Sequence, residues 1–414
     1  MTLSKWPGRK RPPAARRQCR IAWRTPAVSS SVALTMVLAI VAAFSLSTGV
    51  RAAEWLVEGR ADLRGEYDDN ITLDPTNELS VFGATFSPEV DIGGRSQNWD
   101  LFLNTRLDFA RFTEEDFLNS EDQRVALEGS YRTQLGVWDL DAVFRRATTR
   151  TTELTDTGRV EVGAERLDFK LRPSWRYVLG RRDSIFVNGR WDRSTFDVST
   201  LDDFTRYSAG GGWTHQLTEQ DDLTLSGFAS HFENDSVSGN ESDTFGSQLG
   251  WHRVFSERLE TRIAVGPQYT TSDSTVTGSN NSLGFIVDGE VNYDLDDRTL
   301  IAGNLSRSID ASGGGSVVER DVVRLSVRHQ YEPELAFRLS IYYLQNRDAN
   351  DQNAARDREY FAVEPGVSWQ FERDWFLTGG YRYRTQELTG ESRASSNAVF
   401  VTLRHQFPKW TFAN

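Results

Sequence analysis

The sequence predicts an all-β protein, a transmembrane antiparallel β-barrel of about eighteen strands. A bulky aromatic residue recurs at intervals of 38, 38, 42, 38, 38 and 38 residues, at Trp175, Trp213, Trp251, Tyr293, Tyr331, Trp369 and Phe407. Apolar and polar residues alternate around each, as in a strand with two unlike faces. A repeat of about 40 residues fits one hairpin of two long strands. A β-propeller repeats at about 40 to 50 residues, but each blade needs four short strands.

The clearest strand runs from Trp55 to Tyr67. One face is apolar or small, and the other carries five consecutive charges, at Glu58, Arg60, Asp62, Arg64 and Glu66. The same pattern surrounds Trp175. Few soluble sheets place so many charges on one face of a strand, so we expect a lipid-facing side and a water-facing side. The residues expected to face lipid are Val57, Leu63, Leu167, Phe169 and Leu403. Those expected to face the lumen include Arg60, Asp62, Lys170 and Arg172.

Continued along the chain, the pattern predicts strands that begin near residues 55, 81, 98, 123, 137, 165, 184, 206, 223, 243, 259, 282, 299, 319, 335, 360, 375 and 396. The long polar connections are 68–80, 113–122, 148–164, 197–205, 234–242, 271–281, 310–318, 347–359 and 388–395. They alternate strictly with short turns at 93–97, 133–136, 178–183, 218–222, 255–258, 294–298, 332–334 and 372–374. Outer-membrane barrels have long extracellular loops and short periplasmic turns. Because 206–217 and 299–309 alternate weakly, sixteen strands remain an alternative.

Four prolines lie inside expected strands, where a residue without an N–H indicates a β-bulge or a misplaced boundary. They are Pro88, Pro173, Pro267 and Pro365.

Aromatic residues gather at one level next to the short turns, which predicts a periplasmic aromatic girdle. Its members are Trp55, Trp99, Trp138, Trp175, Trp213, Trp251, Tyr293, Tyr331, Trp369 and Phe407. An outer girdle is expected at Tyr67, Phe109, Phe144 and Tyr269.

Residues 1–52 are expected to form a signal peptide, and residues 53–414 a single barrel domain. The leader has a basic start, an apolar stretch from about Val32 to Leu46, and the small-residue cleavage pattern Val50-Arg51-Ala52. Cleavage removes nine basic and no acidic residues, leaving 38 basic against 59 acidic residues and a formal charge of −21. This charge argues against nucleic acid as a partner. Cleavage of the signal peptide also removes Cys19, the only cysteine, so disulfides and thiolate metal sites are excluded in the mature chain.

No residues in the sequence form a recognisable catalytic set. The histidines are His215, His231, His252, His329 and His405, and none has a serine or acid at a spacing that indicates a triad. Clustered carboxylates in the first two long connections could hold Ca²⁺ or Mg²⁺, but neither connection has the residue spacing of an EF-hand. We therefore predict no enzyme, no metal and no cofactor.

The expected inner wall is rich in arginine, whose planar guanidinium can hold carboxylates or hydroxyls of a passing glycan. The candidate glycan contacts are Arg60, Arg64, Arg106, Arg124, Lys170, Arg172, Arg324, Arg328, Arg382 and Arg384. The alternative is a solvated lumen with cross-strand ion pairs. The longest connection, 148–164, is the candidate for a constriction.

Two stretches resemble the putative β-barrel porin 2 family. They are Glu66-Tyr67-Asp68-Asp69-Asn70 and the closing Ser396-Asn397-Ala398-Val399-Phe400-Val401-Thr402-Leu403, which leads to Gln406-Phe407-Pro408. That family includes EpsL-type outer-membrane barrels encoded in exopolysaccharide clusters, some linked to exosortase systems. The resemblance covers nearly all of the mature chain and implies a role in moving polysaccharide across the outer membrane. It supplies no catalytic residues. Seven residues follow Phe407, whereas many barrels end on the aromatic residue itself.

We therefore expect a channel in the outer membrane of a Gram-negative cell that serves as a conduit for exopolysaccharide export. A general or solute-specific diffusion porin and a structural or adhesive barrel remain open. Expected partners are outer-membrane lipid, lipopolysaccharide, the barrel-assembly machinery, the exported polysaccharide and a periplasmic export protein.

Overall fold

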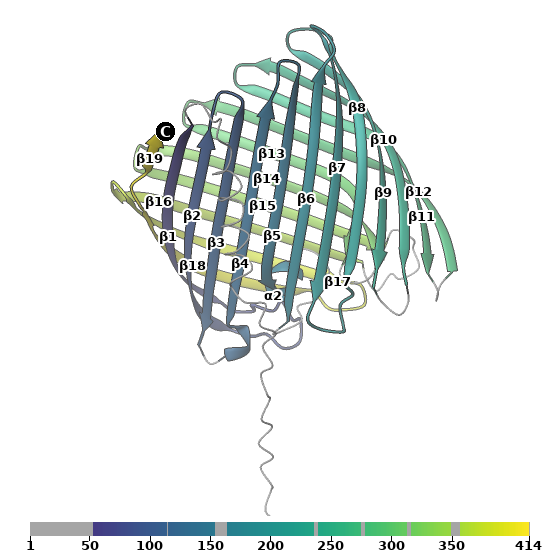
Figure 1. Ribbon diagram of the computed structural model, residues 1–414. Coiled ribbons are helices and arrows are strands. Elements are labelled where there is room, and N and C mark those ends of the chain that lie inside the picture. Colours follow the sequence, from purple (N-terminus) through teal and green to yellow (C-terminus); the bar gives the residue numbers. More distant parts are fainter. Residues whose placement is uncertain are drawn as a thin grey trace, which may run out of the picture. The chain divides into compact units, whose positions relative to one another are not determined.

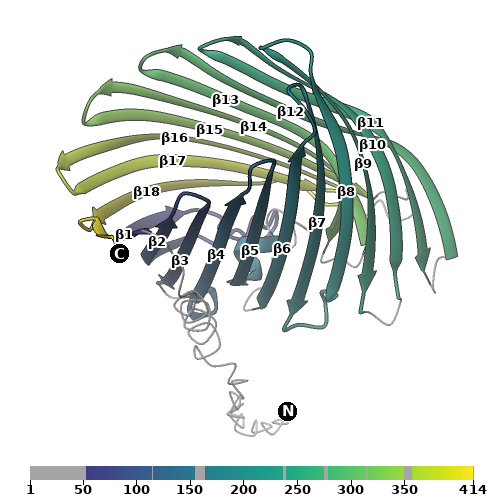
Figure 2. The ribbon, with the colours of Figure 1, turned by 45° about the horizontal axis from the view of Figure 1, so that its top comes forward.

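The described part of the chain folds as a closed antiparallel β-barrel of eighteen long strands, seen from two directions in Figures 1 and 2. The computed structural model describes residues 53–113, 115–153, 164–235, 239–274, 278–312, 316–348 and 357–413. The expected signal peptide, residues 1–52, lies outside the described residues. Within those residues, no helix is long and apolar enough to cross a membrane.

Each strand pairs with its neighbour in the sequence, and β1 also pairs with β18, which closes the ring. The first nine strands are β1 (Glu54–Asp68), β2 (Val81–Arg95), β3 (Trp99–Phe112), β4 (Ser120–Arg132), β5 (Gly136–Thr148), β6 (Glu165–Val178), β7 (Asp183–Phe196), β8 (Phe204–Gln216) and β9 (Asp221–Asn234). The next nine are β10 (Glu241–Ser256), β11 (Leu259–Ser274), β12 (Gly278–Asp296), β13 (Thr299–Ser312), β14 (Ser316–Glu332), β15 (Leu335–Asp348), β16 (Arg358–Glu372), β17 (Trp375–Leu388) and β18 (Ala394–Gln406). Three short elements complete the described chain: η1 (Asp116–Leu118), α2 (Thr149–Thr152) and β19 (Trp410–Ala413).

The strand number and the alternation of long and short connections are confirmed. Every strand begins within four residues of its predicted start, and the sixteen-strand alternative is wrong. The largest differences are at β12, β4 and β14, whose first residues extend into the connections expected at 271–281, 113–122 and 310–318. Polar residues pair there because an antiparallel ladder can continue beyond the membrane wherever backbone groups remain opposite each other.

The prolines do not mark β-bulges, so that interpretation is wrong. Each keeps its partner on one neighbouring strand, as in the pair Pro88–Ala61, and interrupts the ladder with the other neighbour without shifting the register. The same holds for Pro173, Pro267 and Pro365. A missing N–H therefore costs one ladder contact but no change of alignment. The register shifts instead just before four short turns, at 254/256, 294/296, 330/332 and 370/372.

The residues after Phe407 complete the barrel seam. β18 pairs with β1 from Arg60 to Asp68, and β19 continues along the same edge of β1 from Glu54 to Val57. The chain therefore ends beside β1 (Figure 2). An edge strand exposes unpaired N–H and C=O groups, so this extension covers backbone that an ending at Phe407 would leave open.

Side chains that meet inside the barrel identify its inner face. Leu73, from the connection after β1, packs against Val322, Leu344 and Tyr360 of three different strands. Followed through the strand pairing, this face contains the charged row of β1, and the opposite face contains Leu63, which is 52% exposed. The lipid-facing and lumen-facing sets of β1 are thus arranged as predicted.

Candidate functional site: the lumen of the barrel

The ten predicted glycan contacts all project from the inner face, but their surroundings differ. Carboxylates hold Arg60, Arg64, Arg106, Arg382 and Arg384. The amide of Asn104 accepts a hydrogen bond of 2.9 Å from Arg124. Arg324 lies over the ring of Tyr342, and Arg328 donates to Gln330. Lys170 and Arg172 form no hydrogen bond or ion pair within the described residues.

The two stretches that carry the family resemblance meet at the seam between β1 and β18. Asp68 is 1% exposed and accepts hydrogen bonds from Arg384, at 2.5 Å, and from Ser396, at 2.7 Å. Beside it, the carboxylate of Asp69 accepts from the backbone and side-chain amides of Asn397, at 2.6 and 2.8 Å. Buried charges need such partners. The motif therefore joins the first strand to the last, which is a structural role.

Asn70, the last residue of the motif, shapes the connection 69–80. Its side-chain amide donates to the carbonyl oxygens of Asp74 and Ser395, and its side-chain oxygen accepts from the N–H of Asp74. Within the turn, N–H groups of Thr76 and Asn77 hold the pKa of Asp74 below its usual value. These bonds turn the chain inward. Asp69 and Asp74 of this connection are thus bound by protein groups, whereas Glu78 is exposed and forms no hydrogen bond or ion pair within the described residues.

The inward turn places Leu73 in the lumen. Leu73 is 2% exposed and has a φ of 52°, in the left-handed region that a side chain with a Cβ rarely adopts. Its packing against β14, β15 and β16 offsets that strain. Because the ring closes between β1 and β18, β15 lies four strands from β1, and this contact joins the connection to non-adjacent strands of the wall.

The connection 149–164 also enters the lumen with its described residues, α2 and Glu153. Glu153 is fully buried and forms an ion pair of 2.8 Å with Arg166, which also bonds Asp168 at 2.7 Å. Burial lowers the pKa of Arg150, and the carboxylates of Asp122, Glu66 and Asp68 partly offset that effect. The described residues of this connection therefore lie against the inner face; residues 154–163 lie outside the described residues, and the constriction stays a prediction.

A third contact inside the barrel joins β8 and β13, which are five strands apart in the ring. Arg206 forms an ion pair of 2.8 Å with Asp310. Around it, Phe204 and Phe232 pack with Ile309 and Val317. Arg166 joins this cluster to α2, since its guanidinium lies 5.6 Å from the ring of Phe204. We call these three contacts the septum, defined by Leu73, Glu153, Arg166, Phe204, Arg206 and Asp310. It narrows the lumen at the end of the long connections.

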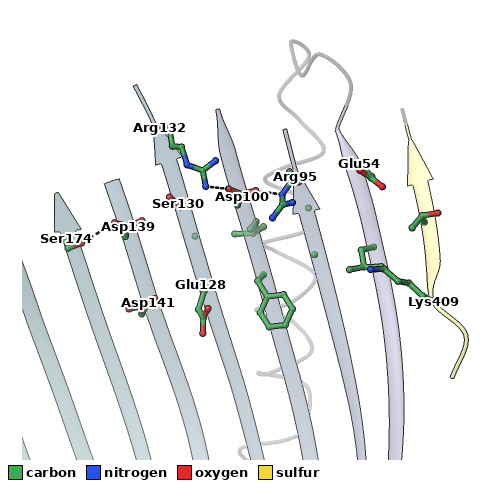
Figure 3. A pocket seen from close by; sticks show the side chains of 17 residues that line it. Glu54, Arg95, Asp100, Glu128, Ser130, Arg132, Asp139, Asp141, Ser174 and Lys409 are labelled. Atoms are coloured by element: carbon green, nitrogen blue, oxygen red, sulfur yellow. Dashed lines mark hydrogen bonds and ion pairs between the residues drawn. The ribbon is translucent and has the colours of Figure 1, made fainter. Parts of the chain in front are cut away.

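The short-turn end of the lumen is open and charged. One pocket there, of about 800 Å³, is lined by residues of β1 to β6, Lys409 and Thr411. Figure 3 shows Arg95 and Arg132 turned toward Asp100, while Glu128 and Asp141 have no basic partner among the residues drawn. A second pocket, of about 680 Å³, carries Arg176, Arg181, Arg182 and Arg262 on β6 to β11 and the connection between β6 and β7. This mouth therefore offers exposed charges of both signs.

The aromatic residues next to the short turns share one level. Trp99, Tyr131, Trp138 and Trp175 are consecutive partners across four strands, and the rings of Trp138 and Trp175 stack at 5.4 Å. β19 extends this row beyond the prediction, because Phe412 pairs with Trp55. Phe412 and Trp410 are 54% and 62% exposed. Their placement fits a membrane boundary.

Four of the histidines, His215, His231, His252 and His329, have polar partners that their sequence spacing did not reveal. His252 contacts Asp222 and Glu260, at 3.2 and 2.9 Å, and His215 contacts Asp183 at 2.9 Å. None of these contacts includes a serine. Within the described residues, no three His, Cys, Asp or Glu side chains are placed to hold a metal ion.

Fold and lumen together define a porin-like β-barrel. Residues 234–407 match the model of the family described as "Putative beta-barrel porin 2", which confirms the family predicted from the sequence. No curated protein matches the chain.

Three solved structures are similar to this chain. Acinetobacter baumannii OccAB3 has 10% identity and a TM-score of 0.44, over 86% of this chain and 99% of that one. Pseudomonas aeruginosa OccK5 (OpdH) has 10% identity and a TM-score of 0.41, over 85% and 98%. The ferric citrate transporter FecA has 10% identity and a TM-score of 0.42 over 81% of this chain, which spans 60% of the length of FecA.

Three parts of the lumen were missed from sequence. Leu73 lies in a connection without periodicity, so nothing marked it as buried. Arg206 and Asp310 lie near the ends of strands that alternate weakly. The lumen-facing position of Arg404, which binds Asp62 at 2.7 Å, could have been predicted. It follows Leu403, a predicted lipid-facing residue, and successive residues of a strand face opposite sides.

Proposed function

We propose that this chain is an outer-membrane channel that carries exopolysaccharide out of a Gram-negative cell. The observation that carries the proposal is the exposed, unneutralised arginine on the inner wall. Arg172, Arg324 and Arg328 are exposed and contact no carboxylate within the described residues. Guanidinium groups bind hydroxyls and carboxylates with directional hydrogen bonds, so such a wall suits a glycan.

The septum also suits a conduit for a polymer. An 18-stranded barrel is wide enough for an aqueous lumen, and an unobstructed lumen of that size would pass small solutes as well as a polymer. The contacts of the septum restrict small solutes until a partner or cargo displaces them. We propose a periplasmic export protein as that partner, delivery by a cleaved signal peptide, and insertion by the barrel-assembly machinery.

A diffusion porin is the second candidate. It is favoured by the short-turn mouth, where exposed charges of both signs line pockets of about 800 and 680 Å³ without any feature specific to a polymer. Small hydrated solutes need no more than that.

Deletion of the gene separates the two candidates. The export proposal expects the mutant to lose surface polysaccharide and to regain it when the native gene is restored. Normal surface polysaccharide in the mutant, together with solute conductance by the purified barrel in planar bilayers, contradicts export and supports the porin.

A further inference from the structure

The strand register places two arginines directly opposite each other on the inner face. Arg328 of β14 is the partner of Arg338 of β15. The next inward pairs along these strands are Ser326–Ser340 and Arg324–Tyr342. We call these six residues the β14–β15 patch. The pair after them is Val322–Leu344, which contacts Leu73 inside the barrel, so the patch faces the lumen on the short-turn side of the septum.

Like charges directly opposite each other on a sheet repel and are normally compensated. The pair Arg124–Arg145 shows such compensation, since Arg145 binds Asp168 at 2.7 Å and Arg124 binds Asn104. Arg328 and Arg338 are different. Within the described residues Arg338 forms no hydrogen bond or ion pair, and Arg328 bonds only the neutral Gln330, at 3.2 Å. The repulsion between them is therefore left uncompensated by the protein.

Among the described residues of the wall, no carboxylate forms an ion pair with Arg328 or Arg338. The charges that act on Arg338 include two further cations, Arg328 and Arg404. On the next strand, Glu364 lies opposite Ser340, but its nearest cation is Arg382, at 4.0 Å. A bound anion would relieve the repulsion, and two exposed guanidiniums give it paired donors.

The opposite wall has the opposite charge. Glu128 of β4 is the direct partner of Asp141 of β5, and both are exposed. β4 and β14 are ten strands apart in a ring of eighteen, so the acidic pair and the β14–β15 patch face each other across the lumen. Glu128 and Arg328 each lie four residues before the last residue of their strand, which puts them at one level. An anion that enters from the short turns is repelled by one wall and attracted to the other.

We propose that the β14–β15 patch binds the carboxylate groups of an acidic oligosaccharide. Arg328 and Arg338 hold a carboxylate, and the hydroxyls of Ser326 and Ser340 lie beside it for hydrogen bonds to the sugar. Arg324 lies one inward pair beyond the two serines along β14, where its contact of 5.1 Å with the ring of Tyr342 holds it in place. It binds the next acidic group of the oligosaccharide. This inference deepens the proposed export function and rests on it, because it assigns the cargo to the acidic polysaccharides.

The test is calorimetric titration of the full barrel in detergent with trigalacturonate, with neutral maltotriose and inorganic sulfate as comparisons. We expect trigalacturonate to bind more tightly than either. Each of Arg328→Gln and Arg338→Gln should weaken its binding roughly tenfold, as expected for one charged hydrogen-bonded contact. Arg328→Lys should lose less, because the charge remains.

The matched control is Arg132→Gln. It removes the same charge from the same mouth, but on the acidic wall, where Arg132 is bound to Asp100. It should leave the binding of trigalacturonate almost unchanged. Heat-dependent gel mobility identifies any variant that fails to fold. If the Gln variants fail to fold, Arg328→Lys still tests the inference.

Three results overturn the inference: trigalacturonate that binds no better than maltotriose, sulfate that binds as tightly as trigalacturonate, or an equal loss in Arg132→Gln. The export proposal fails separately, in cells that lack the gene and retain normal surface polysaccharide. A barrel that binds trigalacturonate through Arg328 while such cells are normal has an acidic-sugar site without an export role.

Discussion

The two ends of the lumen use the same residue types in opposite ways. Near the long connections, charged side chains are buried and paired: Asp68 with Arg384, and Asp168 with Arg166, where both carboxylates are 1% exposed. Near the short turns, Arg328, Arg338, Glu128 and Asp141 are exposed and have no oppositely charged contact within the described residues.

The difference shows that composition alone does not indicate what a lumen charge does. A buried charge must be paired, because only a close counter-ion and hydrogen bonds offset the free energy lost when the charge leaves water. Such pairs hold the septum and the seam in place. An exposed charge keeps its hydration and remains free to meet a solute. Function is therefore expected where the pairing is incomplete.

The largest expected effect is on the buried pair at the seam. Asp68→Ala leaves Arg384 buried without its counter-ion and should lower the free energy of unfolding by about 3–5 kcal/mol. Urea unfolding of the barrel in lipid vesicles measures this. The matched control is Asp141→Ala at the other end, which should change stability by less than about 0.5 kcal/mol. Similar losses in both variants would remove the distinction between the two ends.

The next effect concerns the septum. Leu73→Ala removes a side chain that is 2% exposed and should cost about 2–5 kcal/mol of local packing, which releases the connection 69–80. Ion conductance in planar bilayers should then rise above that of the native barrel. Leu63→Ala, on the lipid face, is the control and should leave conductance unchanged. A native barrel that already conducts as well as Leu73→Ala would show that the septum restricts nothing.

A smaller effect is expected at the C-terminus. Removal of residues 408–414 leaves Glu54 to Val57 without their partners on β19, at a cost of about 0.5–1.5 kcal/mol for each hydrogen bond lost. The melting temperature should fall while the barrel still forms, because β18 keeps its own pairing with β1. Trp410→Ala, which preserves the backbone, should lower it less. An unchanged melting temperature after truncation would mean that β19 adds nothing to closure.

The smallest effect is expected outside the lumen. Glu387 and Arg393 form an ion pair of 2.8 Å with side chains that are 48% and 64% exposed. Exposed pairs of this kind contribute little to stability. Glu387→Ala should therefore be indistinguishable from the native barrel in urea unfolding, and a measurable loss would show that pairing matters at exposed positions too.

The wall of the barrel was predictable because its signals are local. Alternation along Trp55 to Tyr67 assigns both faces, and the contrast between long and short connections orders the strands. The ion pairs were less accessible, since whether Arg60 meets Glu89 depends on the register between strands 29 residues apart. β19 was missed because four residues after Pro408 carry too short an alternation to indicate a strand.

The septum was beyond prediction for a different reason. Leu73 is buried by residues of β14, β15 and β16, which are about 250 to 290 residues away in the chain and come near it only once the ring has closed between β1 and β18. A polar connection gives no sign of the direction in which it folds. Its anchor, Asn70, belongs to the family motif, but its hydrogen bonds depend on β18.

Thiol labelling from each side of the membrane tests the central claim, that a water-filled lumen on the short-turn side is separated from the exterior by the septum. In a chain without Cys19, Ser326→Cys and its neighbour Leu325→Cys are treated with a charged, membrane-impermeant methanethiosulfonate. The account predicts rapid labelling of Ser326→Cys from the periplasmic side, slow labelling from the cell exterior, and faster exterior labelling once Leu73→Ala is added. Labelling of Leu325→Cys in place of Ser326→Cys would contradict the assignment of the faces, and equal labelling of Ser326→Cys from both sides would contradict the septum.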